Sequence, residues 1–298
     1  MRMVDRARRM ASKCLRPLVA RAAKAYVAGE RLEDALRVAD KLSERGLGIT
    51  LGYWDSPKDT PRSVADAYLD AIDALANRQH GYVSIKIPSL DYSHELSAKV
   101  VDRAALRRVR VHFDALGPET ADRSRALFDR LLDRGAELSY TLPGRWLRSV
   151  SDAAWAAERG IVVRVVKGQW ADPADPRRDP RRGYLEVIDA LAARAAHVAV
   201  ASHDTQLVAA AVARLKGANT SCELELLHGL PMRRSLAQAD ALSLGVHVYV
   251  PYGETYLPYA ISRVRQNPRV LWWLLRDLFA SHGPISRVPP RQPELAAK

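Results

Sequence analysis

Eight short β-rich runs, separated by longer amphipathic stretches, most strongly limit what this chain can fold into. Several of the runs are almost continuously apolar, which is typical of parallel strands that are buried on both faces. Strands that alternate with helical patterns predict βα units. The runs cover residues 46–54, 81–88, 108–114, 136–143, 160–166, 197–202, 221–227 and 247–253.

Helical patterns fill most of the intervals between these runs, at 61–77, 119–134, 152–159, 184–195, 205–216, 232–242 and 255–279. Eight βα units in about 250 residues predict an α/β fold of the (βα)8 TIM barrel type. A doubly wound open sheet is the alternative, but no G-x-G-x-x-G motif follows an early strand.

No composition break, linker or internal repeat divides the chain. We therefore expect one barrel at 46–283, preceded by an N-terminal helical region at 1–45. The last segment, 284–298, is rich in proline and charge, and it predicts a flexible tail.

The chain is basic, with 46 Lys and Arg against 34 Asp and Glu and a net charge of +12. Such an excess can serve nucleic acid, an anionic membrane surface or an anionic cofactor. The arginines are spread along the helical patterns without a nucleic-acid-binding motif, so no nucleic acid partner is expected. The Arg-rich segment 1–29 lacks the apolar core of a signal peptide and predicts a solvated helix. Contact with a membrane surface is the alternative.

The two cysteines, Cys14 and Cys222, are too few and too far apart for a disulfide framework or a zinc site. No stretch is long and apolar enough to span a bilayer. These features favour a cytoplasmic protein without a bound metal, with peripheral contact at the inner face of the membrane as a further possibility.

Polar residues recur where the predicted strands end, which is where chemistry gathers in a TIM barrel. Any one of them could be an ordinary rim residue, but their recurrence at most strand ends indicates a site. Because the set is cationic on balance, we expect an anionic ligand such as a phosphorylated cofactor or a carboxylate. The residues are Lys86, Asp114, Thr141, Arg164, Lys167, Ser202, His203, Glu225, His228 and Tyr249.

The segment PYGETYLPYAISRVRQNP, residues 251–268, follows the last predicted strand. Its polar residues recur at spacings of three and four, so they share one helix face. A tyrosine and a cation that face the same way just past a strand predict an anion-binding surface. The residues are Tyr259, Ser262, Arg263 and Gln266.

Several segments, in this order, resemble the proline dehydrogenase family, which consists of FAD-dependent distorted barrels that oxidise proline to pyrroline-5-carboxylate. The strongest segment begins at Tyr249 and is similar to the family pattern Y-x-P-x-G…Y-x-x-R-R-x-x-E. The resemblance covers about Gly29 to Phe279. Shorter segments match the family's S-V-K, R-L-V-K-G, A-T-H-N and E-x-x-x-L-x-G-M motifs, at 84–86, 164–168, 201–204 and 225–229 respectively.

The resemblance implies roles for individual residues. Lys86 and Arg263 match residues that hold the substrate carboxylate, while Tyr249 and Tyr259 match residues around the substrate ring. Leu227 matches an apolar wall of the pocket.

Asp114 belongs to the same catalytic set and matches the aspartate that ends the third strand beside the site. Further positions match the surroundings of the FAD, where Arg164 matches the arginine at the reactive edge of the flavin. The rest of the implied cofactor set is Lys167, Gly168, Thr141, Ser202, His203 and Gln266.

Some positions depart from the family pattern. Ser262 stands where the first arginine of a pair is expected, Gln266 replaces a glutamate, and Thr141 lies where a glutamine is usual. The aromatic residue expected just after Gly168 is also displaced or changed. The resemblance implies an FAD-dependent oxidoreductase of L-proline or a related cyclic amino acid, with a quinone as the electron acceptor. A flavoenzyme with another substrate, and a barrel that only binds a ligand or partner, stay open.

Overall fold

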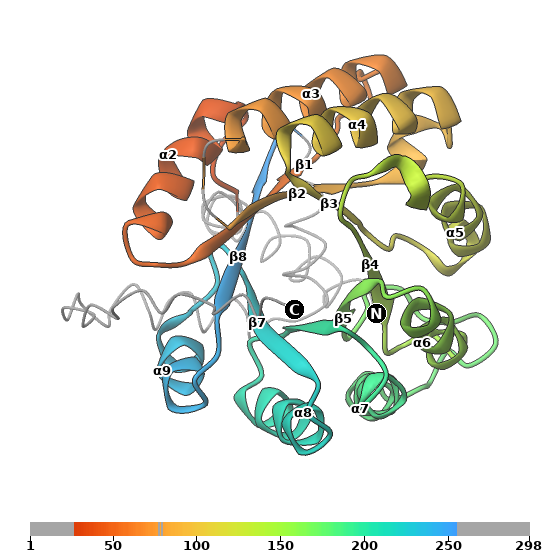
Figure 1. Cartoon of the computed structure of the whole chain (residues 1–298), viewed down its shortest axis with the longest axis vertical. Coiled ribbons are helices and arrows are strands. Elements are labelled where there is room, and N and C mark those ends of the chain that lie inside the picture. The colour runs from red at the N-terminus through yellow and green to blue at the C-terminus, as the bar shows by residue number, and fades with distance from the viewer. Residues whose placement is uncertain (1–26, 77, 79, 255–298) are drawn as a thin grey trace, which may run out of the picture.

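The computed structural model describes residues 27–76, 78 and 80–254. Within them, eight parallel strands close into a barrel in which β8 pairs with β1 (Figure 1). The predicted TIM barrel is confirmed, since each β-rich run holds one strand and only β8 begins a residue earlier. The strands are β1 (Gly48–Tyr53), β2 (Gly81–Ile85), β3 (Arg110–Phe113), β4 (Leu138–Pro143), β5 (Val162–Val166), β6 (His197–Ala201), β7 (Ser221–Leu227) and β8 (Val246–Tyr252).

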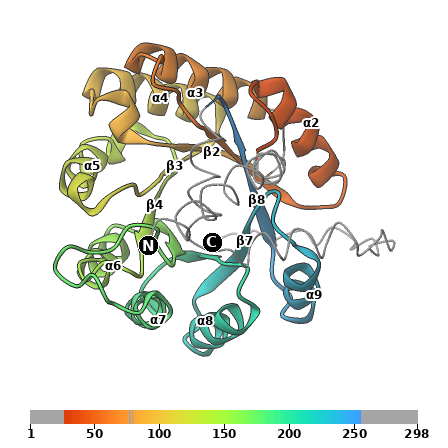
Figure 2. The same ribbon diagram turned by 180° about the vertical axis from the view of Figure 1, so that it is seen from behind.

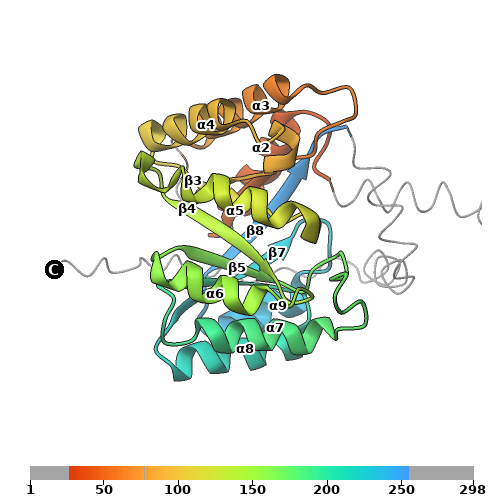
Figure 3. The same cartoon turned by 90° about the vertical axis from the view of Figure 1, so that its right-hand side faces the viewer.

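Helices surround this barrel, as the end-on views show (Figures 1 and 2). From the side, α3 and α4 lie across the barrel from α7 and α8 (Figure 3). The α-helices are α2 (Leu32–Ser43), α3 (Pro61–Leu75), α4 (His94–Arg107), α5 (Ala121–Asp129), α6 (Ser149–Glu158), α7 (Pro180–Leu191), α8 (Thr205–Gly217) and α9 (Arg233–Ala241). Short 3-10 turns are η1 (Ile87–Leu90), η2 (Pro118–Thr120) and η3 (Leu132–Arg134). Among the described residues, no helix has the length and apolar character needed to cross a membrane.

Helix α4 was not among the predicted helical patterns. Ser93 begins it, because its hydroxyl accepts a hydrogen bond from the Leu96 amide at 3.2 Å. Part of its buried face consists of the small residues Ser97, Ala98 and Ala104. Small side chains give a weak apolar period, and that period is the main signal for an amphipathic helix in a sequence.

Most of the predicted N-terminal region (residues 1–26) and the whole predicted tail lie outside the described residues, as does the helical pattern predicted at 255–279. Helix α2 falls within the N-terminal helical region expected at 1–45 and lies against β1 and β8. The proposed boundaries of that region, of the barrel at 46–283 and of the tail at 284–298 stay predictions.

The apolar core lies between the strands and the helices. Phe128 of α5 packs edge-on against three other aromatic rings, with ring centroids 4.8 Å from Phe113, 5.3 Å from Tyr140 and 5.5 Å from Trp155. Such edge-on pairs add to the stabilisation that burial of the rings already provides. The core therefore fixes β3 and β4, which carry two of the predicted site residues at their ends.

The inside of the barrel is polar, because alternate residues of several strands point inward with polar side chains. At the amino-terminal end of the strands, Glu223 of β7 lies between two histidines. Its carboxylate is 2.9 Å from Nδ1 of His247 and 3.6 Å from Nε2 of His197. Gly48 leaves room for this contact, since a Cβ there would lie 2.4 Å from Nε2 of His247.

This cluster makes stability depend on pH. Burial alone would lower the pKa of His247, but the charge of Glu223, its hydrogen bond and the charge of Glu225 together outweigh burial and raise that pKa above the usual 6.5. Other charged groups facing this end are Glu225 and Arg110. A raised folded-state pKa contributes stability that is complete below pH 6.5 and is lost as the pH rises through the folded value.

We therefore expect the contribution of His247 to the free energy of unfolding to fall as the pH rises from 6 to 9, so that wild type loses stability relative to His247→Gln over that range. Urea unfolding of both proteins across that range measures it. His94→Gln, at the start of α4, is the control and should keep the wild-type slope. Parallel curves for wild type and His247→Gln would contradict the assignment.

Candidate active site

Arg164 lies at the centre of a buried ion-pair network inside the barrel. It projects from β5 and is only 4% exposed. Its Nε and Nη2 donate to the two carboxylate oxygens of Glu225 at 2.6 and 2.7 Å, and its Nη1 donates to Asp114 at 2.9 Å. Burial alone would lower the pKa of Arg164, but the facing carboxylates raise it well above the usual value. The guanidinium is therefore a permanent cation held between two acidic groups.

Asp114, just past the end of β3, is fixed by neutral donors as well. Ser84 donates to its Oδ2 at 2.8 Å and Tyr249 donates to the same oxygen at 3.2 Å. Thr141 donates to Oδ1 at 3.4 Å. Residues from β2, β4 and β8 thus position one carboxylate, which sequence order alone does not indicate.

Tyr249 reaches the network because its neighbouring strand has no side chain in the way. A Cβ at Gly52 of β1 would lie 2.1 Å from the tyrosine hydroxyl. Nε1 of Trp54 donates to that hydroxyl at 3.4 Å. The Tyr249 ring also lies 5.4 Å from the guanidinium carbon of Arg164. The hydroxyl is therefore held between Trp54 and Asp114 at one end of the barrel.

Lys86 follows β2 and is mostly buried, with 14% of its side chain exposed. Its Nζ donates to the Tyr53 carbonyl at 2.5 Å and lies 3.9 Å from Oδ1 of Asp55. Burial lowers the pKa of Lys86, and the charges of Asp55 and Asp114 oppose that effect. An ammonium has three donors, so this geometry is compatible with one more anionic acceptor.

Gly168 lies in the loop after β5. It adopts the left-handed conformation with φ of +88°, and a Cβ there would lie 3.0 Å from that of Pro143. Glycine is therefore required by both backbone and space. The preceding residue, Lys167, lies 3.7 Å from Asp204.

His203 joins the ends of β6 and β7. Nε2 accepts from the Leu227 amide at 2.9 Å, and Nδ1 lies 3.2 Å from the Pro231 carbonyl. This pattern places the proton on Nδ1 of a neutral ring. Burial lowers the pKa of His203 to about 4, in agreement with that state. Both ring nitrogens are thus bonded to backbone, while the neighbouring Ser202 accepts from the Asp204 amide at 3.1 Å.

The predicted site residues thus fall into three sets. Around the barrel interior the structure gathers Lys86, Asp114, Thr141, Arg164 and Tyr249, and along the ends of β5 to β7 it places Lys167, Gly168, Ser202, His203 and Leu227. The others, Tyr259, Arg263 and Gln266, together with Ser262, lie outside the described residues.

The cations predicted at the strand ends have acidic partners. Arg164 faces Asp114 and Glu225, so its own charge is offset within the barrel. Lys86 has Asp55 nearby in the same way, although that aspartate was not among the predicted residues. Among the described residues, no group of three His, Cys, Asp or Glu side chains is placed to hold a metal ion.

Several residues of the network were missed from the sequence as site residues. For those that lie on strands, the signal in the sequence was the alternation of inward and outward side chains. This alternation shows which residues point into the barrel, but it does not show which residue each one contacts. Glu225 was noted only as a strand-end residue, while His112 is buried with its ring nitrogens 2.8 Å from Ser139 and 2.6 Å from Thr141. The unassigned residues are Thr50, Trp54, Asp55, Tyr82, Ser84, His112 and Glu225.

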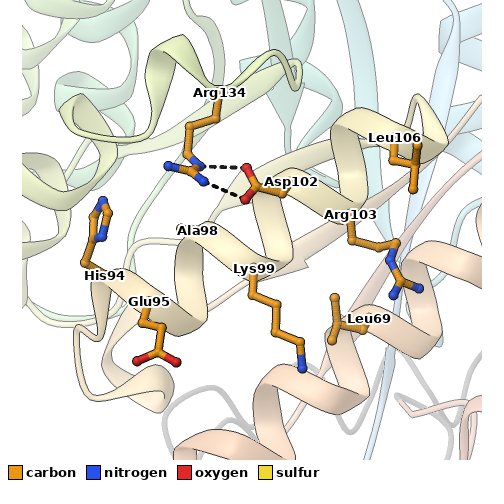
Figure 4. Close-up of a pocket in the computed structure, with 9 residues that line it drawn as sticks. All are labelled: Leu69, His94, Glu95, Ala98, Lys99, Asp102, Arg103, Leu106 and Arg134. Carbon is orange, nitrogen blue, oxygen red and sulfur yellow. Dashed lines mark hydrogen bonds and ion pairs between the residues drawn. The ribbon is translucent and has the colours of Figure 1, made fainter.

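A groove of about 560 Å³ on the outer helix layer lies apart from this network. It runs along α4, where Arg134 binds Asp102 through two hydrogen bonds of 2.7 and 2.5 Å (Figure 4). Leu106 at its edge is 75% exposed. None of the predicted site residues lines it.

No family model matches the sequence. The chain is 23% identical over 273 residues to proline dehydrogenase 1 of Bacillus subtilis (strain 168). The aligned region makes up 86% of this chain and 90% of that protein. It is 26% identical over 272 residues to the proline dehydrogenase of Deinococcus radiodurans, with 83% and 86% covered. The chain is thus distantly similar to curated proline dehydrogenases over most of its length.

Solved structures agree on the fold of this chain. Proline utilization A from Bdellovibrio bacteriovorus matches with a TM-score of 0.69 and 18% identity, covering 91% of this chain and 36% of that one. The protein of the same name from Corynebacterium freiburgense matches with a TM-score of 0.68 and 17% identity, covering 98% and 36%. This chain thus spans only about a third of the length of these larger chains, and the likeness establishes the barrel alone.

Proposed function

We propose that this chain is an FAD-dependent oxidoreductase that oxidises L-proline or a related cyclic amino acid to the imine. The observation that carries the proposal is the buried Asp114–Arg164 pair with Tyr249 and Lys86 beside it, in a distant homologue of proline dehydrogenases. FAD, when bound, would supply the acceptor for the hydride that leaves the substrate.

The substrate carboxylate is the group that Lys86 would bind. A mostly buried ammonium is costly unless an anion or several acceptors satisfy it. Tyr53 and Asp55 satisfy part of its hydrogen-bonding capacity, and a carboxylate would complete it. The Tyr249 ring, held by Trp54 and Asp114, would pack against the substrate ring.

The described residues fit a large polar cofactor at the ends of β4, β5 and β7. Three buried polar atoms in the loops there have no hydrogen-bond partner within the described part of the chain, namely Nε of Arg145, Oε1 of Gln169 and Nδ1 of His228. Buried polar atoms without a partner are rare and call for an explanation such as a bound group. Arg164, Lys167, Gly168 and Ser202 would hold FAD, with Thr141 and His203 nearby.

The full-length protein should take up FAD, and titration of the apoprotein, followed by the quenching of flavin fluorescence, tests this. FMN, which lacks the adenosine portion, should bind more weakly if the loops of β5 to β7 hold that portion. A folded protein that neither retains nor takes up FAD would exclude the proposed function.

A substitution of Ser262 tests whether proline or another amino acid is the substrate. A hydrogen bond to a charged group is worth about 1.5–3 kcal/mol. If Ser262 replaces one of two arginines that bind the carboxylate, Ser262→Arg should raise kcat/KM for L-proline by about ten- to a hundredfold. Ser262→Ala is the control and should change this value little.

The opposite result would favour the second candidate function. If Ser262→Arg abolishes activity on a different cyclic or N-substituted amino acid, the serine is an adaptation to that substrate. If wild type turns over no member of such a panel although it binds FAD, a barrel that only binds a ligand or partner is favoured. The quinone acceptor is proposed from the resemblance alone. The cytoplasmic location is proposed from the two isolated cysteines, and the peripheral membrane contact from the Arg-rich segment 1–29.

A further inference from the structure

Glu225 binds Arg164 through both of its carboxylate oxygens. It lies on β7, 3% exposed, and both of its oxygens accept from the guanidinium. Thr50 of β1 donates to Oε1 at 3.0 Å. Among residues 27–76, 78 and 80–254, the hydrogen bonds to this carboxylate come from Arg164 and Thr50, both on barrel strands.

The charges in this network do not cancel. Arg164 carries one positive charge, while Asp114 and Glu225 each bring a carboxylate within 2.9 Å of it. Lys86, the next cation, has Asp55 at 3.9 Å. With both carboxylates ionised, the three central groups sum to one negative charge in a region where water screens poorly.

We propose that Glu225 is a positioning residue that orients Arg164 and offsets its charge, and so makes the bound flavin harder to reduce. The proposal rests on the proposed function, in which Arg164 lies at the reactive edge of the flavin. A reduced flavin carries more negative charge than an oxidised one, and a lone cation beside it favours the reduced form. A carboxylate bonded face to face with that cation removes most of this effect.

Two alternatives give different results. If Glu225 only holds β5 and β7 together, its charge is unimportant for the flavin, and a neutral residue of the same shape leaves the reduction equilibrium unchanged. If instead its charge acts on the flavin, that equilibrium moves whenever the balance between Glu225 and Arg164 changes.

The test compares the FAD-loaded full-length wild type with Glu225→Gln, equilibrated without oxygen against a dye of known potential. Removal of one buried negative charge should raise the ratio of reduced to oxidised flavin by about tenfold or more at a fixed potential. Glu223→Gln is the matched control, because it removes an inward carboxylate from the same strand, two residues nearer the amino-terminal end of the barrel and without a bond to Arg164. Its ratio should stay within about threefold of wild type. An unchanged or lower ratio in Glu225→Gln overturns the proposal.

If Glu225→Gln does not fold, the double variant Arg164→Gln, Glu225→Gln takes its place, since it removes both charges of the pair. Under the proposal, the ratio of reduced to oxidised flavin in this double variant stays near the wild-type ratio. A fall of about tenfold or more would show that Arg164 acts on the flavin without an offset from Glu225, and would overturn the proposal.

A wild type that binds no FAD defeats the proposed function and this inference together. A wild type that binds FAD, with unchanged ratios in Glu225→Gln, defeats this inference alone.

Discussion

Arg164→Ala is expected to lower the free energy of unfolding by about 3–5 kcal/mol, because it leaves two carboxylates buried without their cation. Glu225 is 3% exposed and Asp114 has 19% of its side chain exposed, so water can reach the first of them very little. Thermal and urea unfolding of the apoprotein measure the change without any contribution from a cofactor.

Arg103→Ala is the control for this prediction. Arg103 and Asp73 form an ion pair on the surface with 35% and 36% of their side chains exposed, so about 1 kcal/mol or less should be lost. Equal losses in the two variants would mean that the interior network contributes no more than a surface pair.

Lys86→Met should lower kcat/KM by about ten- to a hundredfold or more, on whichever amino acid reduces the flavin. Methionine keeps the apolar length of the side chain and removes the charge-assisted bond to the substrate carboxylate, which is worth about 1.5–3 kcal/mol. Steady-state kinetics with the substrate and with its methyl ester distinguish the cause, since the ester lacks the carboxylate charge and should be much less sensitive to the change.

The matched control is Lys99→Met, which replaces an exposed lysine of α4 that lies 3.5 Å from Asp66. It should leave kcat/KM unchanged. If Lys86→Met also leaves it unchanged, Lys86 does not bind the carboxylate.

The strands were predictable because strands buried on both faces give apolar runs bounded by turn residues. Helix α4 was not, because its buried face includes Ser97, Ala98 and Ala104 and gives little apolar period. A prediction that relies on the period of large apolar side chains will miss any helix whose buried face is made largely of small residues.

The site was partly predictable for a similar reason. A closed barrel brings strand ends together, so Asp114 and Arg164 could be grouped without knowledge of their contacts. The partner of Arg164 could not be derived, since Glu225 lies 61 residues away and the pairing depends on which inward positions face each other across the barrel. The backbone contacts of both nitrogens of His203 likewise depend on the loop after β7.

The sequence also placed an anion-binding face at Tyr259, Ser262, Arg263 and Gln266, which lies outside the described residues. Its role stays a prediction. The variant Ser262→Arg tests it by kinetics, independently of the network around Arg164.

Anaerobic titration of the FAD-loaded wild type with L-proline tests the central claim most directly. Absorbance of the oxidised flavin should disappear as proline is added and return when a soluble quinone is supplied, with the cyclic imine formed in proportion. The contradictory result is a bound flavin that dithionite reduces fully but that neither L-proline nor any other cyclic amino acid reduces at concentrations up to saturation.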